Sequence, residues 1–175
     1  PCFAPWCKVE MNNGTCKRVD EIKRGDLIKS INERGENDYS EVVCVIETEI
    51  ENARCKLSNI QPNNLMITPW HPIRINNKWT FPENIDKSVE RDCEKIYSFI
   101  LNKNHIIYIN EIECVTLGHG IKSDDVVSHE YFGNMNKLIN DLSSMSGWNN
   151  GKIIFKKDPM IRDPQSGLVI KMVQK

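Results

Sequence analysis

The stretch Thr68-Pro-Trp-His-Pro72 lies near the middle of the 175-residue chain and does most to decide its fold. Together with Pro82, its two prolines exclude an α-helix from this region, because proline lacks the backbone N–H and clashes with the preceding turn. Short apolar runs flank it at residues 64–68 and 73–75, and such runs between turn signals favour β-strands. The middle of the chain is therefore predicted to be β.

The same stretch carries two side chains that can perform chemistry together. Thr68 and His71 lie three residues apart at the end of an apolar strand, where a hydroxyl and an imidazole can converge on one oxygen or nitrogen atom. A histidine can give a proton to a leaving nitrogen near neutral pH. The structural alternative is a strand-end histidine hydrogen-bonded to a carbonyl group.

Outward from this centre, runs of valine, isoleucine and aromatic residues alternate with Gly, Asn and Pro signals, which is typical of an all-β domain. The stretch K-R-V-D-E-I-K-R-G-D at 17–26 is compatible with one helical turn capped by Gly25. Strands are predicted at residues 7–11, 26–30, 41–47, 64–68, 73–75, 95–101, 105–110 and 112–117.

The pattern changes after His119. Leu138, Ile139, Leu142 and Met145 recur at helical spacing, so a helix is predicted over 134–146, with Asn134 as N-cap and Gly147 as the stop. The tail carries K-I-I-F at 152–155 and G-L-V-I-K-M-V at 167–173, on either side of a P-Q-S-G turn. These segments predict a late β-hairpin.

Composition excludes several classes of function. The formal net charge is −1 and the lysines are scattered, so nucleic acid is not an expected partner. No apolar run approaches the roughly 18 to 20 residues that span a bilayer. The length suits one domain with its own core, and we expect a monomer. Because the chain starts at Pro1 rather than Met, we expect it to be a piece of a longer protein.

Seven cysteines are spread along the chain without any C-x2-C pair, so zinc-ribbon spacing is absent. The odd count and apolar neighbours such as V-V-C-V-I at 42–46 indicate reduced cysteines and suggest an intracellular location. The spacings of the four histidines match no familiar ligand pattern. We expect neither a metal nor a cofactor.

Three further segments could contribute to a site. C-V-T-L-G-H-G at 114–120 places Cys114 and Thr116 on one face of a strand and His119 in a glycine-flanked turn. The face shared by Cys114 and Thr116 is equally compatible with core packing. N-K-N-H at 102–105 delivers His105 from a turn onto the next strand, and His129 has no clear partner. Cys2 could act as a nucleophile if a neighbouring group accepted its proton.

Read in order, these segments resemble the Hint domain of hedgehog proteins and inteins, and most closely the Vint type found with von Willebrand factor type A domains. The resemblance rests on C-F at 2–3, M-N-N-G-T at 11–15, V-D-E-I-K-R-G-D-L-I at 19–28 and T-P-W-H at 68–71. It continues in I-Y-S-F-I-L-N-K-N-H at 96–105 and I-E-C-V-T-L-G-H-G at 112–120. The segments H-E-Y-F-G and D-P-Q-S-G-L-V after residue 121 resemble the Vint extension.

The resemblance implies an all-β, horseshoe-like fold of two pseudo-symmetric halves with a C-terminal α-helix and β-hairpin extension. It implies a self-processing core over residues 2–120 and an extension over 121–175 packed on that core as one compact domain. It also implies that the substrate is the chain's own upstream polypeptide, joined at the Pro1–Cys2 bond.

The implied chemistry is an N-to-S acyl shift. Cys2 would attack the carbonyl carbon of Pro1 to form a thioester, while Thr68 distorts the peptide and His71 protonates the departing amino group. His105 and His119 stand where this superfamily carries further site histidines. Cys114 and Thr116 are additional candidates, and so is Glu47, which stands in Y-S-E-V-V-C-V-I-E-T at 39–48, where hedgehog proteins carry an activating aspartate.

One departure limits the reaction. Inteins follow the closing histidine with an asparagine that cyclises, but Gly120 follows His119 here and the chain continues. Splicing is therefore expected to fail, which leaves cleavage or transfer of the acyl group to water, a thiol, an amine or a sterol. The alternative is a processing-inactive module that presents Trp79 or Trp148 to a protein partner. A cysteine hydrolase acting in trans would need an open cleft.

Overall fold

The computed structural model describes residues 1–175 and is almost entirely β, with one short α-helix. The fold class expected from the sequence is confirmed. The strands are β1 (Lys8–Glu10), β2 (Cys16–Arg18), β3 (Leu27–Ile31), β4 (Asn37–Glu49), β5 (Arg54–Ile60), β6 (Leu65–Ile67), β7 (Ile73–Ile75), β8 (Lys78–Thr80), β9 (Val89–Asp92), β10 (Lys95–Leu101), β11 (Ile106–Ile109), β12 (Ile112–Val115), β13 (Lys152–Phe155), β14 (Met160–Arg162) and β15 (Val169–Met172), and the helix is α1 (Met135–Leu142).

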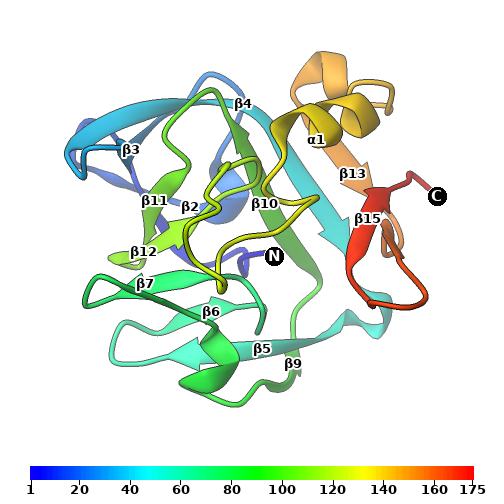
Figure 1. Cartoon of the computed structure of the whole chain (residues 1–175), viewed down its shortest axis with the longest axis horizontal. Helices are drawn as coiled ribbons and strands as arrows, with labels where there is room; N and C mark the ends of the chain where they lie inside the picture. The colour runs from blue at the N-terminus through cyan, green and yellow to red at the C-terminus, as the bar shows by residue number, and fades with distance from the viewer.

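Two sheets organise the first 117 residues (Figure 1). The larger has the strand order β10-β4-β3-β11-β12-β7-β8, and the smaller has the order β6-β5-β9. The 13-residue strand β4 is long enough to pair with β3 near its start and with β10 over the rest of its length. Strands β2, β5, β8 and β9 were not expected from the sequence; their short or highly polar segments give little periodic signal.

The N-terminus lies inside the molecule, between the two sheets (Figure 1). Phe3 forms isolated bridges with Tyr97 of β10 and with Ile67 of β6, and it exchanges backbone hydrogen bonds of 2.8 and 3.0 Å with Tyr97. The N–H of Ala4 donates to the carbonyl of Met66. This pairing fixes residues 2 and 3 between strands that lie far apart in sequence.

Two hydrophobic clusters lie on opposite faces of β10. Phe99 and Tyr97 point into the main core, which gathers 23 buried residues from the first 114 positions. Ile100 points into a second cluster of 11 buried residues, where it meets Leu138 of α1 and Phe155 of β13. The C-terminal segment is therefore packed on the β core through its own apolar contacts.

The predicted helix and tail are only partly as expected. The Asn134 side chain caps α1 by accepting from the N–H of Lys137, but the helix ends at Leu142 instead of Ser146. The expected pairing of residues 152–155 with 167–173 is wrong. Strand β13 instead lies parallel to β4, and the hairpin joins β14 to β15. An apolar strand of four residues does not by itself specify its partner. Strand β13 pairs with β4, which has 13 residues, whereas β15 has four.

The turn before β3 is also a correction. The helical turn covers Val19–Glu21 as a 3-10 turn that ends at Ile22, while Gly25 adopts a φ of 89° in a later turn. The neighbouring Arg24 reaches the C-terminal segment. Its guanidinium donates to the carbonyls of Trp148 and Asn149 at 2.6 and 2.8 Å. No helix of the structure has the length and apolar character that crossing a membrane requires.

Candidate functional site

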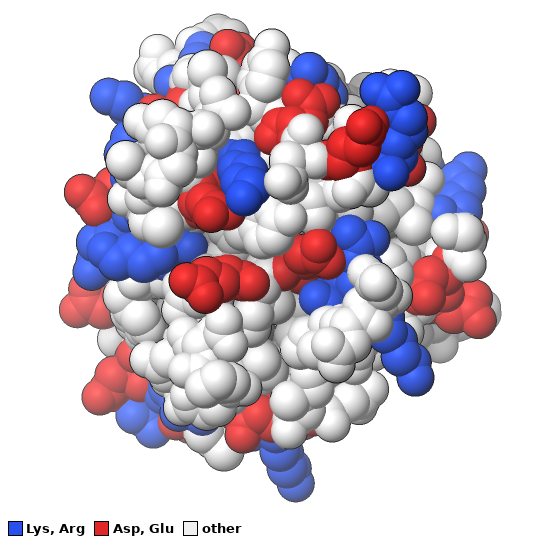
Figure 2. Space-filling model, turned by 90° about the vertical axis from the view of Figure 1, so that its left-hand side faces the viewer, with Lys and Arg blue, Asp and Glu red and all other residues white.

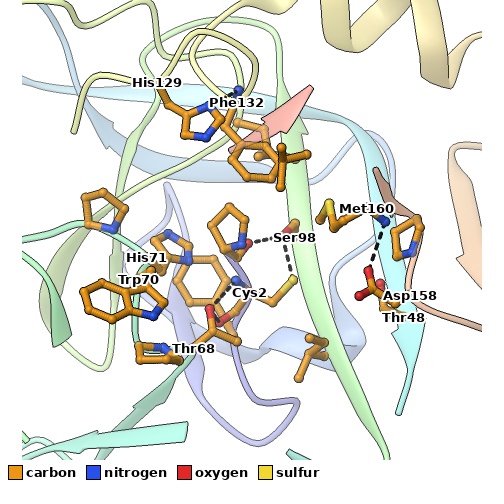
Figure 3. Close-up of a pocket in the computed structure, with 18 of the residues that line it drawn as sticks. Cys2, Thr48, Thr68, Trp70, His71, Ser98, His129, Phe132, Asp158 and Met160 are labelled. Atoms are coloured by element: carbon orange, nitrogen blue, oxygen red, sulfur yellow. Dashed lines mark hydrogen bonds between the residues drawn. The ribbon is translucent and has the colours of Figure 1, made fainter. Parts of the chain in front are cut away.

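A cleft of about 1210 Å³ opens between the β core and the C-terminal segment, and the Pro1–Cys2 peptide lies in its wall. Thr68, Pro69, Trp70 and His71 line the core side, whereas Phe132 and Met160 line the opposite side (Figure 3). The prolines that exclude a helix hold residues 68–71 at the end of β6, beside the buried N-terminal strand. The cleft thus joins the strongest motif of the sequence to Cys2.

Thr68 holds the backbone of Cys2 from both sides. Its hydroxyl oxygen accepts from the Cys2 N–H at 2.8 Å, and the same hydroxyl lies 3.2 Å from the Cys2 carbonyl oxygen, to which it donates. The Thr68 backbone N–H donates to that carbonyl at 3.0 Å. The nitrogen that would leave the Pro1 carbonyl carbon is therefore bound to a fixed hydroxyl.

His71 is 2% exposed and packs its ring 4.5 Å from the ring of Phe3. Its Nε2 lies 2.6 Å from the Val115 carbonyl oxygen, so Nε2 carries the proton, as in the structural reading of this histidine. Its Nδ1 is buried without a partner. Burial, followed by the nearby charge of the Pro1 amine, lowers the pKa of His71 to about 3, so its imidazole is neutral at pH 7.

Ser98 of β10 completes the surroundings of the peptide. It is 5% exposed, and its hydroxyl donates to the carbonyl oxygen of Pro1. The same oxygen lies 3.2 Å from the sulfur of Cys2. Figure 3 shows the hydroxyl between these two groups. The Cys2 thiol, the Pro1 carbonyl and the Cys2 backbone nitrogen thus each have a hydroxyl neighbour.

The sequence model of the Vint family, which is described as a Hint domain, matches residues 1–171 of this chain. The chain belongs to the Vint family of Hint domains. The superfamily is one of self-processing domains, related to inteins. Among curated protein sequences, none matches this Vint domain.

Solved structures agree on the fold. An intein-like domain from Clostridium thermocellum is 16% identical, with a TM-score of 0.55; the alignment covers 66% of this chain and 98% of that one. The DnaX mini-intein from Spirulina platensis is 16% identical, with a TM-score of 0.50 and coverages of 66% and 100%. A variant of the Ssp DnaB mini-intein is 10% identical, with a TM-score of 0.52 and coverages of 66% and 93%.

Two further predicted residues of the Vint domain, Thr116 and His119, also line the cleft. The ring of His119 is held in place because its Nδ1 accepts from the N–H of Ile121 at 2.9 Å. Burial, followed by the neighbouring His105 and His129, lowers the pKa of His119 to about 4. The hydroxyl of Thr116 donates to the backbone carbonyl of His105 at 3.1 Å, so it binds the neighbouring backbone and not a group in the cleft.

Three predicted residues do not reach the cleft. Glu47 is turned to the other face of β4, where its carboxylate accepts from Tyr97 at 2.8 Å and lies 3.2 Å from Lys152. Cys114 is fully buried in the main core, and burial raises its pKa well above the ordinary value. The ring of His105 lies outside the cleft lining, with Nδ1 buried and unpartnered.

The structure also revises the predicted surface. Trp79 and Trp148 are half-buried, the first under the guanidinium of Arg74 and the second against the second hydrophobic cluster. The exposed tryptophan is Trp70, which is 61% exposed at the cleft and meets Phe81 edge-on at 5.3 Å. This aromatic side chain lies within the motif itself, between Thr68 and His71.

Sequence reasoning did not place Ser98 or His129 at the cleft. Ser98 is a single polar residue inside the apolar run I-Y-S-F-I-L, and that interruption was the available signal. His129 lines the cleft, and its Nδ1 accepts from the N–H groups of Tyr131 and Phe132 at 3.1 and 3.0 Å. Although histidines gather here, no group of His, Cys, Asp and Glu side chains has the arrangement that would hold a metal ion.

Proposed function

We propose that this Vint domain cleaves its own chain at the Pro1–Cys2 bond through an N-to-S acyl shift. The proposal rests on one observation. The Thr68 hydroxyl is hydrogen-bonded to both the backbone nitrogen and the carbonyl of Cys2, in a cleft that His71 also lines. A peptide held this firmly inside the protein is a substrate in cis. It leaves Cys2, at 6% exposure, poorly placed to attack a separate protein.

The first step is attack of the Cys2 sulfur on the Pro1 carbonyl carbon, which gives a tetrahedral centre. When the carbon–nitrogen bond breaks, the Cys2 nitrogen takes a proton and remains bonded to the Thr68 hydroxyl. We assign that proton to His71, through the Nδ1 that has no partner in the ground state. Burial keeps this ring neutral at rest, so Nδ1 takes a proton from solvent through the cleft and passes it to the Cys2 nitrogen as the carbon–nitrogen bond breaks. The tetrahedral centre returns one proton to solvent when its carbonyl forms again, so the step balances.

A thioester is less stable than an amide, so the shift needs a way to trap the product. Protonation of the released Cys2 amine by solvent supplies this trap, because an ammonium group has no lone pair for the return attack. The Thr68 backbone N–H and hydroxyl meanwhile keep the Cys2 carbonyl in place. The thioester carbon then faces the cleft. Water, a thiol, an amine or a sterol entering the cleft would complete cleavage or acyl transfer.

Splicing is not part of the proposal. Gly120 follows His119 and has no side chain that could cyclise, and its N–H is engaged by the carbonyl of Gly133 at 2.9 Å. We propose that residues 2–120 perform the chemistry and that residues 121–175 close the second wall of the cleft. The cleft side formed by Phe132 and Met160 comes from this extension.

The test is a fusion of a reporter protein ahead of Pro1, incubated at neutral pH with and without 2-mercaptoethanesulfonate. We expect thiol-dependent release of the reporter as a thioester, identified by intact mass, and no release from Cys2→Ala. Equal release from Cys2→Ala, or no release from the unaltered chain, would contradict the proposal. Cys7→Ala is the matched control, because Cys7 is buried in the main core and burial raises its pKa to about 11.

The rival function is a binding module without processing activity, and Trp70 favours it by its exposure at the cleft. On the face shown in Figure 2, acidic and basic side chains are interspersed, so no single-sign patch marks a polyanionic partner there. Recovery of the intact fusion after long incubation with thiol, from a folded sample, would support the module.

A further inference from the structure

The hydroxyl of Ser98 has no hydrogen-bond partner in the β core other than Pro1 and Cys2. Ser98 lies in β10, between Tyr97 and Phe99, which point into the main core, and opposite Ile46 of β4. Its hydroxyl forms hydrogen bonds only with Pro1 and Cys2, the two residues of the proposed cleavage junction. A buried hydroxyl costs free energy unless it is hydrogen-bonded, so a serine here is justified by those two contacts.

The chemistry of the partners fixes the direction of both hydrogen bonds. The carbonyl oxygen of Pro1 has no proton, so the Ser98 hydroxyl must donate to it. The serine oxygen is then left as an acceptor for the Cys2 thiol, whose sulfur is 3.2 Å away. The proton on sulfur, the hydroxyl and the carbonyl oxygen therefore form one chain that runs from the nucleophile to its target.

We propose that Ser98 is a catalytic residue that relays the thiol proton of Cys2 to the carbonyl oxygen of Pro1 during attack; this inference rests on the proposed function. The sulfur–carbon bond forms as the S–H proton moves to the Ser98 oxygen. The Ser98 hydroxyl proton moves to the carbonyl oxygen as the carbon–oxygen double bond becomes single. The product is a neutral tetrahedral centre with a hydroxyl group, and Ser98 is regenerated.

The relay removes the need for charge at a buried place. Without it, attack would require a thiolate and would produce an oxyanion, in a site where Cys2 and Ser98 are 6% and 5% exposed. Ionised groups are costly in a low-dielectric interior unless they are paired. Arg and Lys side chains form no ion pair with this junction. Concerted transfer through one hydroxyl keeps the thiol, the hydroxyl and the tetrahedral centre neutral during attack.

The experiment uses the same reporter fusion, with 2-mercaptoethanesulfonate raised until the cleavage rate no longer depends on it, so that thioester formation limits the rate. Rates are measured from pH 6 to 8 for the unaltered chain and for Ser98→Ala. We expect the variant to be about 10²-fold slower at pH 6. Its rate relative to the unaltered chain should then rise as the pH is raised, because attack without the relay requires a base to remove the thiol proton.

Two variants separate the relay from a structural effect. Ser98→Thr keeps the hydroxyl, so its rate relative to the unaltered chain should not change with pH. Ser30→Ala is the matched control, since Ser30 is also a fully buried strand serine but its hydroxyl has no partner. Its rate should stay within about threefold of the unaltered chain. Thermal unfolding of each variant confirms that it is folded.

The outcomes distinguish the relay from the reaction that it serves. If Ser98→Ala cleaves as fast as the unaltered chain while Cys2→Ala does not cleave, the relay is wrong and the acyl shift stands. A slow Ser98→Ala variant whose relative rate is constant with pH would reduce Ser98 to a donor that polarises the carbonyl, and the relay would again be wrong. Absence of cleavage by the unaltered chain would overturn both.

Discussion

The hydroxyl of Thr68 lies 2.8 Å from the backbone nitrogen of Cys2 and 3.2 Å from the backbone oxygen of the same residue. One short side chain therefore contacts the nitrogen that leaves in the proposed reaction and the carbonyl that anchors it. Because Thr68 directly follows β6 while Cys2 is the second residue of the chain, this relationship exists only after the two sheets have closed around the N-terminus.

Replacing Thr68 with valine preserves the branched shape and removes the hydroxyl. We expect reporter release to slow by about 10- to 100-fold, because the Cys2 nitrogen loses the acceptor that orients it. Thr68→Ser keeps the hydroxyl and is the control, with a rate close to that of the unaltered chain. Equal rates for the valine and serine variants would remove Thr68 from the mechanism. Time courses on denaturing gels provide the measurement.

His71→Gln removes the proposed proton donor. We expect release to be slower by about 10² to 10⁴-fold at pH 7, the usual range for a general acid. The advantage of the unaltered chain over the variant should grow as pH is lowered from 7 to 5. The pKa of His71 is about 3, so its protonated fraction increases about tenfold for each unit across this interval. An advantage that shrinks at low pH would assign the proton to another group.

Acid should also weaken the fold. The pKa of His71 is about 3 in the folded protein and about 6.5 when the side chain is exposed. Between these two pH values His71 is protonated in the unfolded chain but not in the folded one, so acid favours unfolding. The free energy of unfolding should therefore fall by roughly 1 kcal/mol per pH unit between pH 6.5 and 4. His119, with a pKa of about 4, contributes in the same direction. Urea unfolding at several pH values measures the slope, which His71→Gln should reduce.

Glu47 is expected to matter for stability and not for cleavage. Burial by itself would raise its pKa, but hydrogen bonds from Tyr97 and Lys152 outweigh burial and lower it, so the carboxylate is ionised and joins β4 to β10 and β13. Glu47→Gln should lower the free energy of unfolding by about 1 to 3 kcal/mol. The cleavage rate of the folded variant should be unchanged. A normal unfolding midpoint with a large loss of cleavage would restore Glu47 as a site residue.

Local patterns predicted much of the β architecture. The apolar runs that became β7 and β10 were recognised, and Asn134 was correctly identified as the cap of α1. The segment that forms β5 was missed because R-C-K-L-S-N-I shows no clean alternation. The wrong partner for β13 has a related cause: four apolar residues favour a strand, but long-range packing chooses its neighbour.

For the candidate site, too, local patterns predicted some residues and long-range packing decided the others. Motif and order placed Cys2, Thr68 and His71 together as expectations, and these residues do line one cleft. Ser98 was missed, although alternation along β10 could have separated it from Tyr97 and Phe99. Glu47 was a candidate by resemblance alone; its side chain does not reach the cleft, because its face depends on the register of β4 and a change of one residue turns a side chain to the other side of a sheet.

The all-β class, the threonine–histidine motif and the glycine after His119 could be read from the sequence, because proline, strand patterns and residue chemistry act locally. Only the tertiary structure decided that the Ser98 hydroxyl lies between the Cys2 thiol and the Pro1 carbonyl, that Glu47 faces away, and that the C-terminal segment closes a cleft. The hydrogen bonds among them join residues separated by 50 to 97 positions, and they arise from strand register and core packing, which no local pattern encodes.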